Sequence, residues 1–357
     1  MERRKTRQVF VGDVPLGGDA PIVIQSMLNA PQGDIEANIL QARELSAAGC
    51  QLIRLSVTSM EDIETVKALK ENIRVPIIAD IQMNYKLALA SIEAGIDKIR
   101  INPRYIGGED KIRLVADACK AHGVPIRVGV NSGSVELDLL EKYGGVTPEA
   151  MAESAMRGVK YLEDVDFHDI VISIKSSDIR TMIAAYRIVA AQCDYPLHLG
   201  VTEAGTERMG RVKSSIGIGA LLADGIGDTI RVSLTEDPEA EMPVAYDILQ
   251  AVGARITQTE YIACPSCGRT QYDIQRALRQ IKAKTSHLVG VKIGVMGCIV
   301  NGPGEMSDAD FGYVGGAPNK INLYVGHTPV VMNIPQEEAV QHLVQLIKDH
   351  GRWVDPT

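Results

Sequence analysis

Three cysteines near the C-terminal end of the chain have a spacing that suits a metal centre. Cys264 and Cys267 form a C-x-x-C motif, and thirty residues separate Cys267 from Cys298. Two cysteines spaced in this way bind one metal centre from a tight loop. A third thiolate from a following strand can close on the same site, and three soft thiolates suit zinc or an iron–sulfur cluster.

The fourth ligand would distinguish these two metal centres. A structural zinc site is normally closed by a fourth Cys or His, and the nearest candidate histidines are His287 and His327. With three thiolates, one iron of a cubane cluster lacks a protein thiolate and is free to bind a substrate. Glu305 is a candidate oxygen ligand for that iron, because the Gly-Pro-Gly of residues 302–304 would turn the chain back. An ordinary surface carboxylate is the alternative interpretation of Glu305.

The other cysteines are expected to be core residues, and these are Cys50, Cys119 and Cys193. The chain opens without a signal-peptide pattern and has no run of about 18 apolar residues. We therefore expect a cytoplasmic protein with reduced thiols. A thioredoxin-like role for Cys264 and Cys267 is less favoured, because the motif does not start a βαβ unit.

A second group of residues could bind an anion. Five cations lie in short β-branched segments, namely Arg54, Arg100, Arg127, Lys175 and Arg231, and Asn131 and Ser233 lie close to two of them. The net charge is −8, which disfavours nucleic acid and anionic membranes as partners. Arg forks bind phosphate in a bidentate way, so clustered cations predict a ligand such as a diphosphate. Alternatively, some of these side chains point outward or form internal ion pairs.

The elements that would position these cations alternate along the chain. Short segments rich in Ile and Val, typical of buried parallel strands, begin at Ile22, Gln51, Val75, Asp97, Pro125, Ile170, Leu197 and Thr229. Helical patterns lie between them. Eight such units predict a (β/α)8 TIM barrel over residues 1–254, with its active site at the C-terminal ends of the strands. An open doubly wound sheet is less favoured, because no GxGxxG follows the first strand.

The rhythm changes after about residue 255. Strand-like segments then outnumber the two helical ones, at 270–283 and 336–349, which predicts a small α+β domain over residues 255–357. At the polar strand ends of the barrel, His198 is expected to be a core histidine. Glu203 could serve as a general acid or as the ion-pair partner of an arginine.

The motifs together resemble a known family. The segments EYIACPSCGRT and VMGCIVNGPGE are similar to the cluster-binding motifs of bacterial 4-hydroxy-3-methylbut-2-en-1-yl diphosphate synthases of the non-mevalonate isoprenoid pathway. QSMLNAPQGD, IRVGVNSGS, LHLGVTEAG and IGDTIRVSL resemble barrel segments of that family in the same order. The resemblance covers nearly the whole chain and is to the shorter, two-domain form.

The resemblance implies a specific reaction. It is the reductive ring opening and dehydroxylation of 2-C-methyl-D-erythritol 2,4-cyclodiphosphate, at a [4Fe–4S] cluster with an open or labile apical iron. Cys264, Cys267, Cys298 and Glu305 would hold the cluster, and Glu203 would protonate the leaving oxygen. The diphosphate would be held by Arg54, Arg100, Arg127, Asn131, Lys175, Arg231 and Ser233. A flavodoxin or a ferredoxin would supply the electrons, and the chain would form a homodimer in which the cluster domain of one chain covers the barrel of the other.

One segment departs from the family pattern. The family usually has His and Asp after the third strand, at the positions of Gln82 and Asn84. Two titratable groups are therefore absent, whereas Asp80 is present. We expect the chemistry to survive, because the predicted cluster ligands and the phosphate-binding cations are complete.

Two other functions are compatible with parts of the pattern. One is a non-redox phosphate-binding barrel enzyme with a structural zinc domain, which would be colourless and hold one zinc per chain. The other is a redox sensor or electron carrier whose barrel is only a scaffold. The concentration of cations on the strands disfavours the second function.

Overall fold

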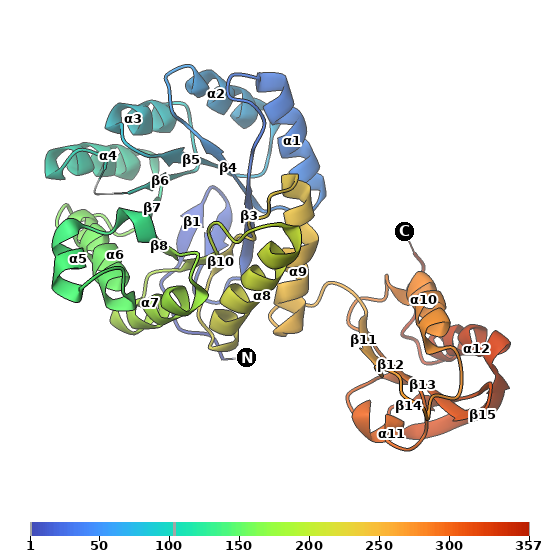
Figure 1. The fold of residues 1–357 in the computed structure, drawn as a ribbon. Coiled ribbons are helices and arrows are strands. Elements are labelled where there is room, and N and C mark those ends of the chain that lie inside the picture. The colour runs from blue at the N-terminus through green and yellow to red at the C-terminus, as the bar shows by residue number, and fades with distance from the viewer. Residues whose placement is uncertain (1, 103–104, 357) are drawn as a thin grey trace. The chain divides into compact units, whose positions relative to one another are not determined.

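The computed structural model describes residues 2–102 and 105–356. The chain forms two compact units, Met1–Arg255 and Ile256–Thr357 (Figure 1). None of the described helices is both long and apolar enough to cross a membrane.

The first unit is a parallel β-barrel. Its strands follow the order β8-β7-β6-β5-β4-β3-β10-β9, and every neighbouring pair is parallel. They are β3 (Val23–Met27), β4 (Leu52–Ser56), β5 (Ile77–Ile81), β6 (Lys98–Ile101), β7 (Ile126–Asn131), β8 (Ile170–Lys175), β9 (His198–Leu199) and β10 (Thr229–Ile230). A parallel bridge between Ile172 and Leu197 joins β8 to β9 and closes the ring. The predicted TIM barrel is confirmed.

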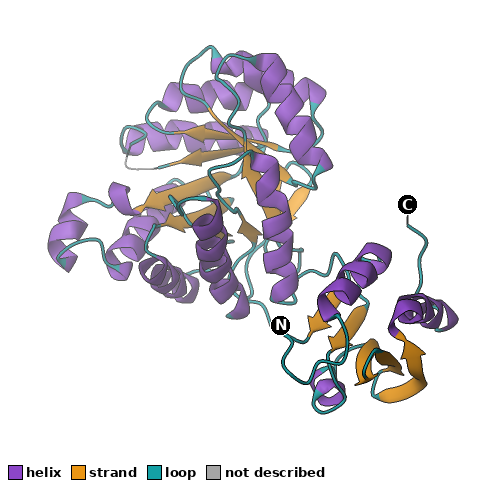
Figure 2. Cartoon of the chain, turned by 45° about the vertical axis from the view of Figure 1, so that its right-hand side comes forward, coloured by secondary structure: helices purple, strands orange, loops and turns teal. Residues whose placement is uncertain are grey.

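Helices surround these strands (Figure 2). They are α1 (Ile35–Ala47), α2 (Asp62–Asn72), α3 (Tyr85–Glu93), α4 (Glu109–His122), α5 (Leu137–Tyr143), α6 (Pro148–Glu163), α7 (Ile179–Gln192), α8 (Glu207–Ala223) and α9 (Glu241–Ala251). Local sequence sets their ends. Thr147 caps α6, with Pro148 at the first helical position, and Gly123 ends α4 at φ 66°.

An N-terminal hairpin closes one end of the barrel. It consists of β1 (Val9–Val11) and β2 (Val14–Leu16), which pair antiparallel, and the sequence analysis did not predict it. Its buried side chains form one cluster with inward residues near the N-terminal ends of the barrel strands, namely Val23, Leu52, Ile78 and Val171. The C-terminal ends of the strands, opposite the hairpin, are left to build a site.

The second unit is a small α+β domain, as predicted. Its sheet has the order β11-β12-β13-β14-β15, in which β11, β12 and β13 are parallel and the remaining pairs are antiparallel. The strands are β11 (Glu260–Ala263), β12 (Lys292–Met296), β13 (Phe311–Ala317), β14 (Lys320–Val325) and β15 (Thr328–Pro335). The helices are α10 (Ile274–Thr285), α11 (Gly302–Glu305) and α12 (Gln336–Asp349), and residues of α10 and α12 share one buried cluster with the sheet. Because β11 and β12 are parallel neighbours, the loops that follow them start at the same edge.

Candidate active site

The barrel interior contains a polar cavity of about 240 Å³ at the C-terminal part of the strands. Strand side chains alternate between the core and the interior, and the interior positions of this barrel are unusually polar. All seven residues predicted to hold the diphosphate line the cavity, namely Arg54, Arg100, Arg127, Asn131, Lys175, Arg231 and Ser233. The other lining residues are Met27, Ser56, Asp80, Gln82, Ser173 and Thr202. The role of the seven predicted residues in substrate binding stays a prediction.

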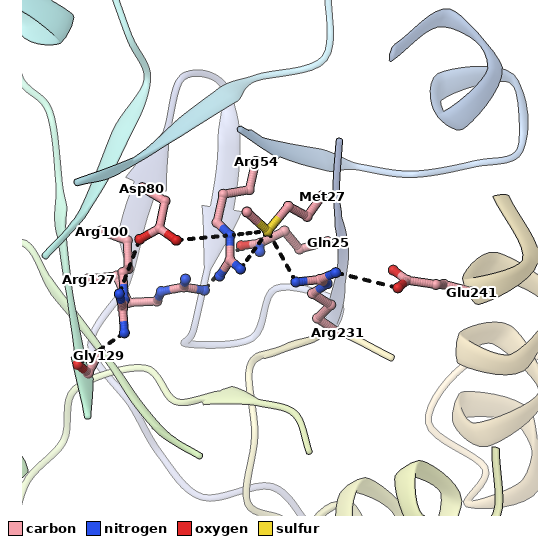
Figure 3. A network of polar contacts seen from close by, with 9 residues as sticks. All are labelled: Gln25, Met27, Arg54, Asp80, Arg100, Arg127, Gly129, Arg231 and Glu241. Atoms are coloured by element: carbon pink, nitrogen blue, oxygen red, sulfur yellow. Dashed lines mark hydrogen bonds and ion pairs between the residues drawn. The ribbon is translucent and has the colours of Figure 1, made fainter. Parts of the chain in front are cut away.

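Asp80 is the carboxylate of this cavity (Figure 3). It lies 3.2 Å from the Arg100 guanidinium and 3.9 Å from that of Arg54. Burial alone would raise the pKa of the Asp80 carboxyl, but Arg54 and Arg100 together hold it below its ordinary value. Asp80 therefore stays ionised and orients two of the cations.

Met27 lies between two guanidinium groups. Its sulfur is 2.7 Å from Nη2 of Arg54 and 3.3 Å from Nη1 of Arg231 (Figure 3). A thioether is a weak acceptor, so these donors are held in place without being neutralised. Burial, with Arg231 and Arg100 nearby, lowers the pKa of Arg54 to about 9, although Asp80 opposes the shift. An anionic oxygen would be a much stronger acceptor for both groups.

Glu241 supports the cavity from α9. This buried carboxylate lies 3.4 Å from the Arg231 guanidinium and accepts a 2.7 Å hydrogen bond from the Ser26 hydroxyl. Asp80 and Glu241 are thus two carboxylates beside five cavity cations. The excess of positive charge is what a diphosphate would neutralise.

Two buried groups of the barrel were not predicted to belong to the site. Lys98 and Gln25 are fully buried, and neither the Lys98 ammonium nor Nε2 of Gln25 has a hydrogen-bond partner among the described residues. Burial, with Arg127 and Arg54 nearby, lowers the pKa of Lys98 well below its ordinary value. Residues two apart in a strand share a face. Lys98 lies two residues before Arg100, so the sequence could have predicted that Lys98 also faces the barrel interior.

His198 is a buried core residue, as expected. It is fully buried, and its pKa is lowered well below the ordinary value by burial and by the neighbouring cations, so the imidazole is neutral.

Gly129 leaves the space that the Arg100 side chain occupies in the barrel interior. A Cβ atom at Gly129 would lie 2.3 Å from Nε of Arg100, so any larger residue would push that guanidinium aside.

Glu203 differs from these residues. Its side chain is exposed, it is not among the residues that line the cavity, and its backbone has φ 50°, in the left-handed region. Its neighbour Thr202 does line the cavity. A non-glycine residue in this conformation is under backbone strain, which is common at functional sites. The catalytic role of Glu203 stays a prediction.

The three cysteines of the second unit line one pocket of about 150 Å³ together with Glu305. Cys264 directly follows β11, and its backbone N–H donates to Val295 of β12. Cys298 lies two residues after β12. The adjacent parallel strands therefore bring the two cysteine-bearing loops together.

Thr270 organises the C-x-x-C loop. Its hydroxyl oxygen accepts a 3.1 Å hydrogen bond from the Cys267 backbone N–H and lies 3.0 Å from the Ser266 hydroxyl. Ser266 has φ 69°, a conformation that this local bonding supports. A Cβ atom at Gly297 would lie 2.7 Å from the same hydroxyl, so glycine is needed where the second loop passes.

Thiol acidity separates Cys267 from two of the core cysteines. The pKa of Cys267 is lowered, mainly by a hydrogen bond from the backbone of Arg269 and further by its side chain. Burial instead raises the pKa of Cys50 to about 12, and it raises that of Cys119 as well. Thiolates are the form that binds metal, so the exposed Cys267 is suited to be a ligand. Cys50 and Cys119 are core residues, as predicted.

The cysteine pocket presents thiol and carboxylate donors. No group of three His, Cys, Asp or Glu side chains in residues 2–102 and 105–356 is arranged to hold a single metal ion. Three thiols and a carboxylate nevertheless surround one pocket. This donor set fits a polynuclear iron–sulfur group better than one tetrahedral zinc.

The fold and the two pockets define a class of protein: a (β/α)8 barrel with a cationic interior, joined to an α+β domain with a three-cysteine pocket. Among solved structures, dihydropteroate synthase from Stenotrophomonas maltophilia aligns with 69% of this chain and 98% of its own, at a TM-score of 0.51 and 15% identity. That likeness concerns the barrel fold alone.

Sequence comparison identifies the family. The GcpE TIM-barrel domain matches residues 6–246, and the GcpE protein C-terminal domain matches residues 260–349. The chain therefore belongs to the GcpE family of 4-hydroxy-3-methylbut-2-en-1-yl diphosphate synthases.

Relatives of both named types cover nearly the whole chain. A 4-hydroxy-3-methylbut-2-en-1-yl diphosphate synthase (flavodoxin) from Lawsonia intracellularis is 52% identical over 94% of this chain and 96% of its own length. One from Clostridium perfringens is 47% identical over 98% and 99%. A synthase named for ferredoxin, from Picosynechococcus, is 45% identical over 100% and 95%. The resemblance inferred from the motifs is confirmed.

Proposed function

We propose that the protein is an iron–sulfur oxidoreductase of isoprenoid biosynthesis that converts 2-C-methyl-D-erythritol 2,4-cyclodiphosphate into 4-hydroxy-3-methylbut-2-enyl diphosphate. The conversion takes up two electrons, opens the ring and releases water. The observation that carries the proposal is the convergence of five under-neutralised cations in the barrel cavity of a chain that also has a pocket lined by three cysteines.

The barrel residues bind and orient the substrate. Arg54 and Arg231 exchange the weak sulfur acceptor of Met27 for phosphate oxygens. Asp80 keeps the Arg100 guanidinium in position during this exchange. Binding energy from the phosphates then holds the reacting carbon in place, which favours reaction at a fixed point.

The second unit holds the cofactor. Cys264, Cys267 and Cys298, which line one pocket with Glu305, would be the thiolate ligands of a [4Fe–4S] cluster, and Glu305 would be its fourth, labile ligand. When bound, the cluster supplies single electrons and a Lewis-acidic iron. The structural-zinc alternative is not favoured, because the relatives that cover nearly the whole chain are named 4-hydroxy-3-methylbut-2-en-1-yl diphosphate synthases, which draw electrons from a flavodoxin or a ferredoxin.

Glu203 is the proposed proton donor to the leaving oxygen. Glu203 lies on the polar segment after β9, next to the cavity residue Thr202, and its strained backbone supports a functional role.

A flavodoxin or a ferredoxin would reduce the cluster, and two chains would act as a homodimer. The cytoplasmic location stays a prediction.

Anaerobic purification tests the proposal. We expect about four irons and four sulfides per chain and a cluster whose electron paramagnetic resonance spectrum changes when the cyclic diphosphate is added. Dithionite should then drive formation of the linear diphosphate. A colourless protein with one zinc per chain would contradict the proposal.

The altered third-strand segment offers a sharper test. Gln82 lines the barrel cavity, whereas the Asn84 side chain caps α3 by accepting from the Lys86 backbone N–H. We therefore expect Gln82→His to change the turnover rate about tenfold, with little change in substrate affinity. Asn84→Asp is the matched control and should change neither, because Asp also caps helices. A change in affinity alone for Gln82→His would contradict this assignment.

A further inference from the structure

Helix α10 of the second unit carries an exposed basic face. Its charged residues are all cations, namely Arg276, Arg279, Lys282 and Lys284, and each of them is exposed. Its opposite face is buried, with Ile274, Ala277 and Ile281 in the domain core. The helix is therefore fixed by its apolar side and presents positive charge to solvent.

The cations of α10 have no carboxylate partner among the described residues. Elsewhere in the same unit, Lys292 pairs with Glu260 at 3.3 Å, and Arg352 pairs with Asp310 at 3.3 Å. No ion pair involves the α10 side chains within the described part of the chain. Lys282 instead lies over the Tyr261 ring, 5.2 Å from its centroid. Their charge is thus available to another molecule.

The basic face begins beside the cysteine pocket. Arg269, in the segment that leads from Cys267 to α10, is exposed and lines the cysteine pocket together with Cys267 and Cys298. The hydroxyl of Tyr272, just before the helix, donates to the carbonyl of Met296 at 3.2 Å. Positive charge therefore runs from the edge of the proposed cluster site along the helix.

Charge is distributed unevenly over the chain. Residues 256–357 contain nine Lys or Arg and nine Asp or Glu. Residues 1–255 contain 28 Lys or Arg and 36 Asp or Glu. The whole net charge of −8 is thus on the barrel unit. Five of the nine cations of the second unit fall within residues 269–284, which contain one carboxylate, Asp273. An acidic protein would be repelled by the barrel and steered to this segment.

We propose that Arg269 and the exposed face of α10 form the docking surface for an acidic electron-carrier protein. The inference rests on the proposed function, because it concerns the donor that reduces the cluster. One electron passes from the reduced carrier to the cluster at each encounter, so the carrier is oxidised and the cluster is reduced, and no covalent bond is made or broken. A surface of this kind gives rapid, salt-sensitive association.

Charge reversal on the helix tests the docking surface. The double variant R276E/R279E is compared with R74E/R113E, which changes the net charge equally at two exposed positions of the barrel unit. Turnover is measured with reduced flavodoxin at low ionic strength and, separately, with dithionite. We expect the KM for flavodoxin to rise at least tenfold in the helix variant and less than about twofold in the control. Added salt should narrow the difference.

Dithionite separates the possible failures. Turnover with dithionite should stay within about twofold of the parent in both variants, with equal iron content. An equal rise of KM in both variants, an unchanged KM in the helix variant, or a parallel loss with dithionite would each overturn the docking surface. If the parent protein gave no product even with dithionite, the proposed function itself would fail.

Discussion

The two pockets of the molecule are built in different ways. The barrel pocket collects side chains mainly from strands, and among them Arg127 is fully buried and Lys175 is buried. The cysteine pocket collects side chains from loops, with Cys267 exposed and Cys264 and Cys298 half-buried. Desolvation therefore dominates the electrostatics of the first pocket, and local hydrogen bonds dominate those of the second.

This difference concerns how each site is prepared for its ligand. In the barrel, the closed ring of strands fixes the cations whether or not an anion is present, and their mutual repulsion and desolvation weigh against folding. In the second unit, a few contacts around Thr270 shape the loop, and bound metal is expected to complete the site. The barrel site is therefore built at an energetic cost, whereas the proposed cluster site would be completed by its cofactor.

Removing a proposed cluster ligand should show the difference between the two pockets most clearly. For Cys298→Ala we expect loss of most of the iron and a fall in turnover of about 1,000-fold or more, because the cofactor supplies the redox chemistry. Affinity for inorganic pyrophosphate, measured by calorimetry, should stay within about twofold. Cys119→Ala, in the barrel core, should keep its iron and lose about 1 kcal/mol of stability. Equal iron loss in both variants would show that the pockets are not independent.

Replacing a buried cavity cation should weaken anion binding and raise the free energy of unfolding. Arg127 is fully buried, and its Nε and Nη2 atoms have no partner among the described residues. We expect Arg127→Met to weaken pyrophosphate binding about 100-fold and to raise the free energy of unfolding by about 1–2 kcal/mol. Denaturant unfolding and calorimetry would measure both effects, with exposed Arg74→Met as the control. A lower unfolding free energy would mean that the barrel gains stability from this charge.

The loop around the cysteines should respond to a single hydroxyl group. Thr270→Val removes the acceptor of the Cys267 backbone N–H, so we expect the cluster to be lost about three to ten times faster in the presence of a chelator. The visible absorbance of the cluster gives this rate. Thr270→Ser keeps the hydroxyl and should behave like the parent. If the two variants lose the cluster equally fast, the methyl group rather than the hydrogen bond shapes the loop.

The smallest effect should be a change in how the free energy of unfolding depends on pH. The pKa of Lys98 is lowered in the folded protein, so the unfolded chain binds more protons over the pH range below the ordinary lysine value. The free energy of unfolding should therefore rise as pH increases toward that value. Lys98→Met should flatten this slope and add about 1 kcal/mol at neutral pH. An unchanged slope would show that the buried Lys98 does not destabilise the folded protein in this way.

Much of this arrangement could be predicted from the sequence. Eight short Ile- and Val-rich segments that alternate with helical patterns predicted the barrel, and the C-x-x-C spacing together with Cys298 indicated the second pocket. The hairpin was missed although Val11-Gly12-Asp13-Val14 has a turn signal between apolar residues.

Other features depend on contacts distant in sequence. Ser26 donates to Glu241 across a separation of 215 residues, and no local pattern predicts that contact. The ladder of β10 comprises only Thr229 and Ile230. Beyond it, Arg231 continues as extended chain and donates its N–H to Leu199 at 2.9 Å. Strand length here is set by the neighbouring strand rather than by propensity.

The N-terminal hairpin has a consequence for the order of events during turnover. Because Val9, Val11 and Leu16 fill the base of the barrel with apolar side chains, charged molecules exchange with the cavity at the opposite mouth. Reactant and product then share one route, and each departing product delays the next arrival. The enzyme is therefore expected to show competitive product inhibition.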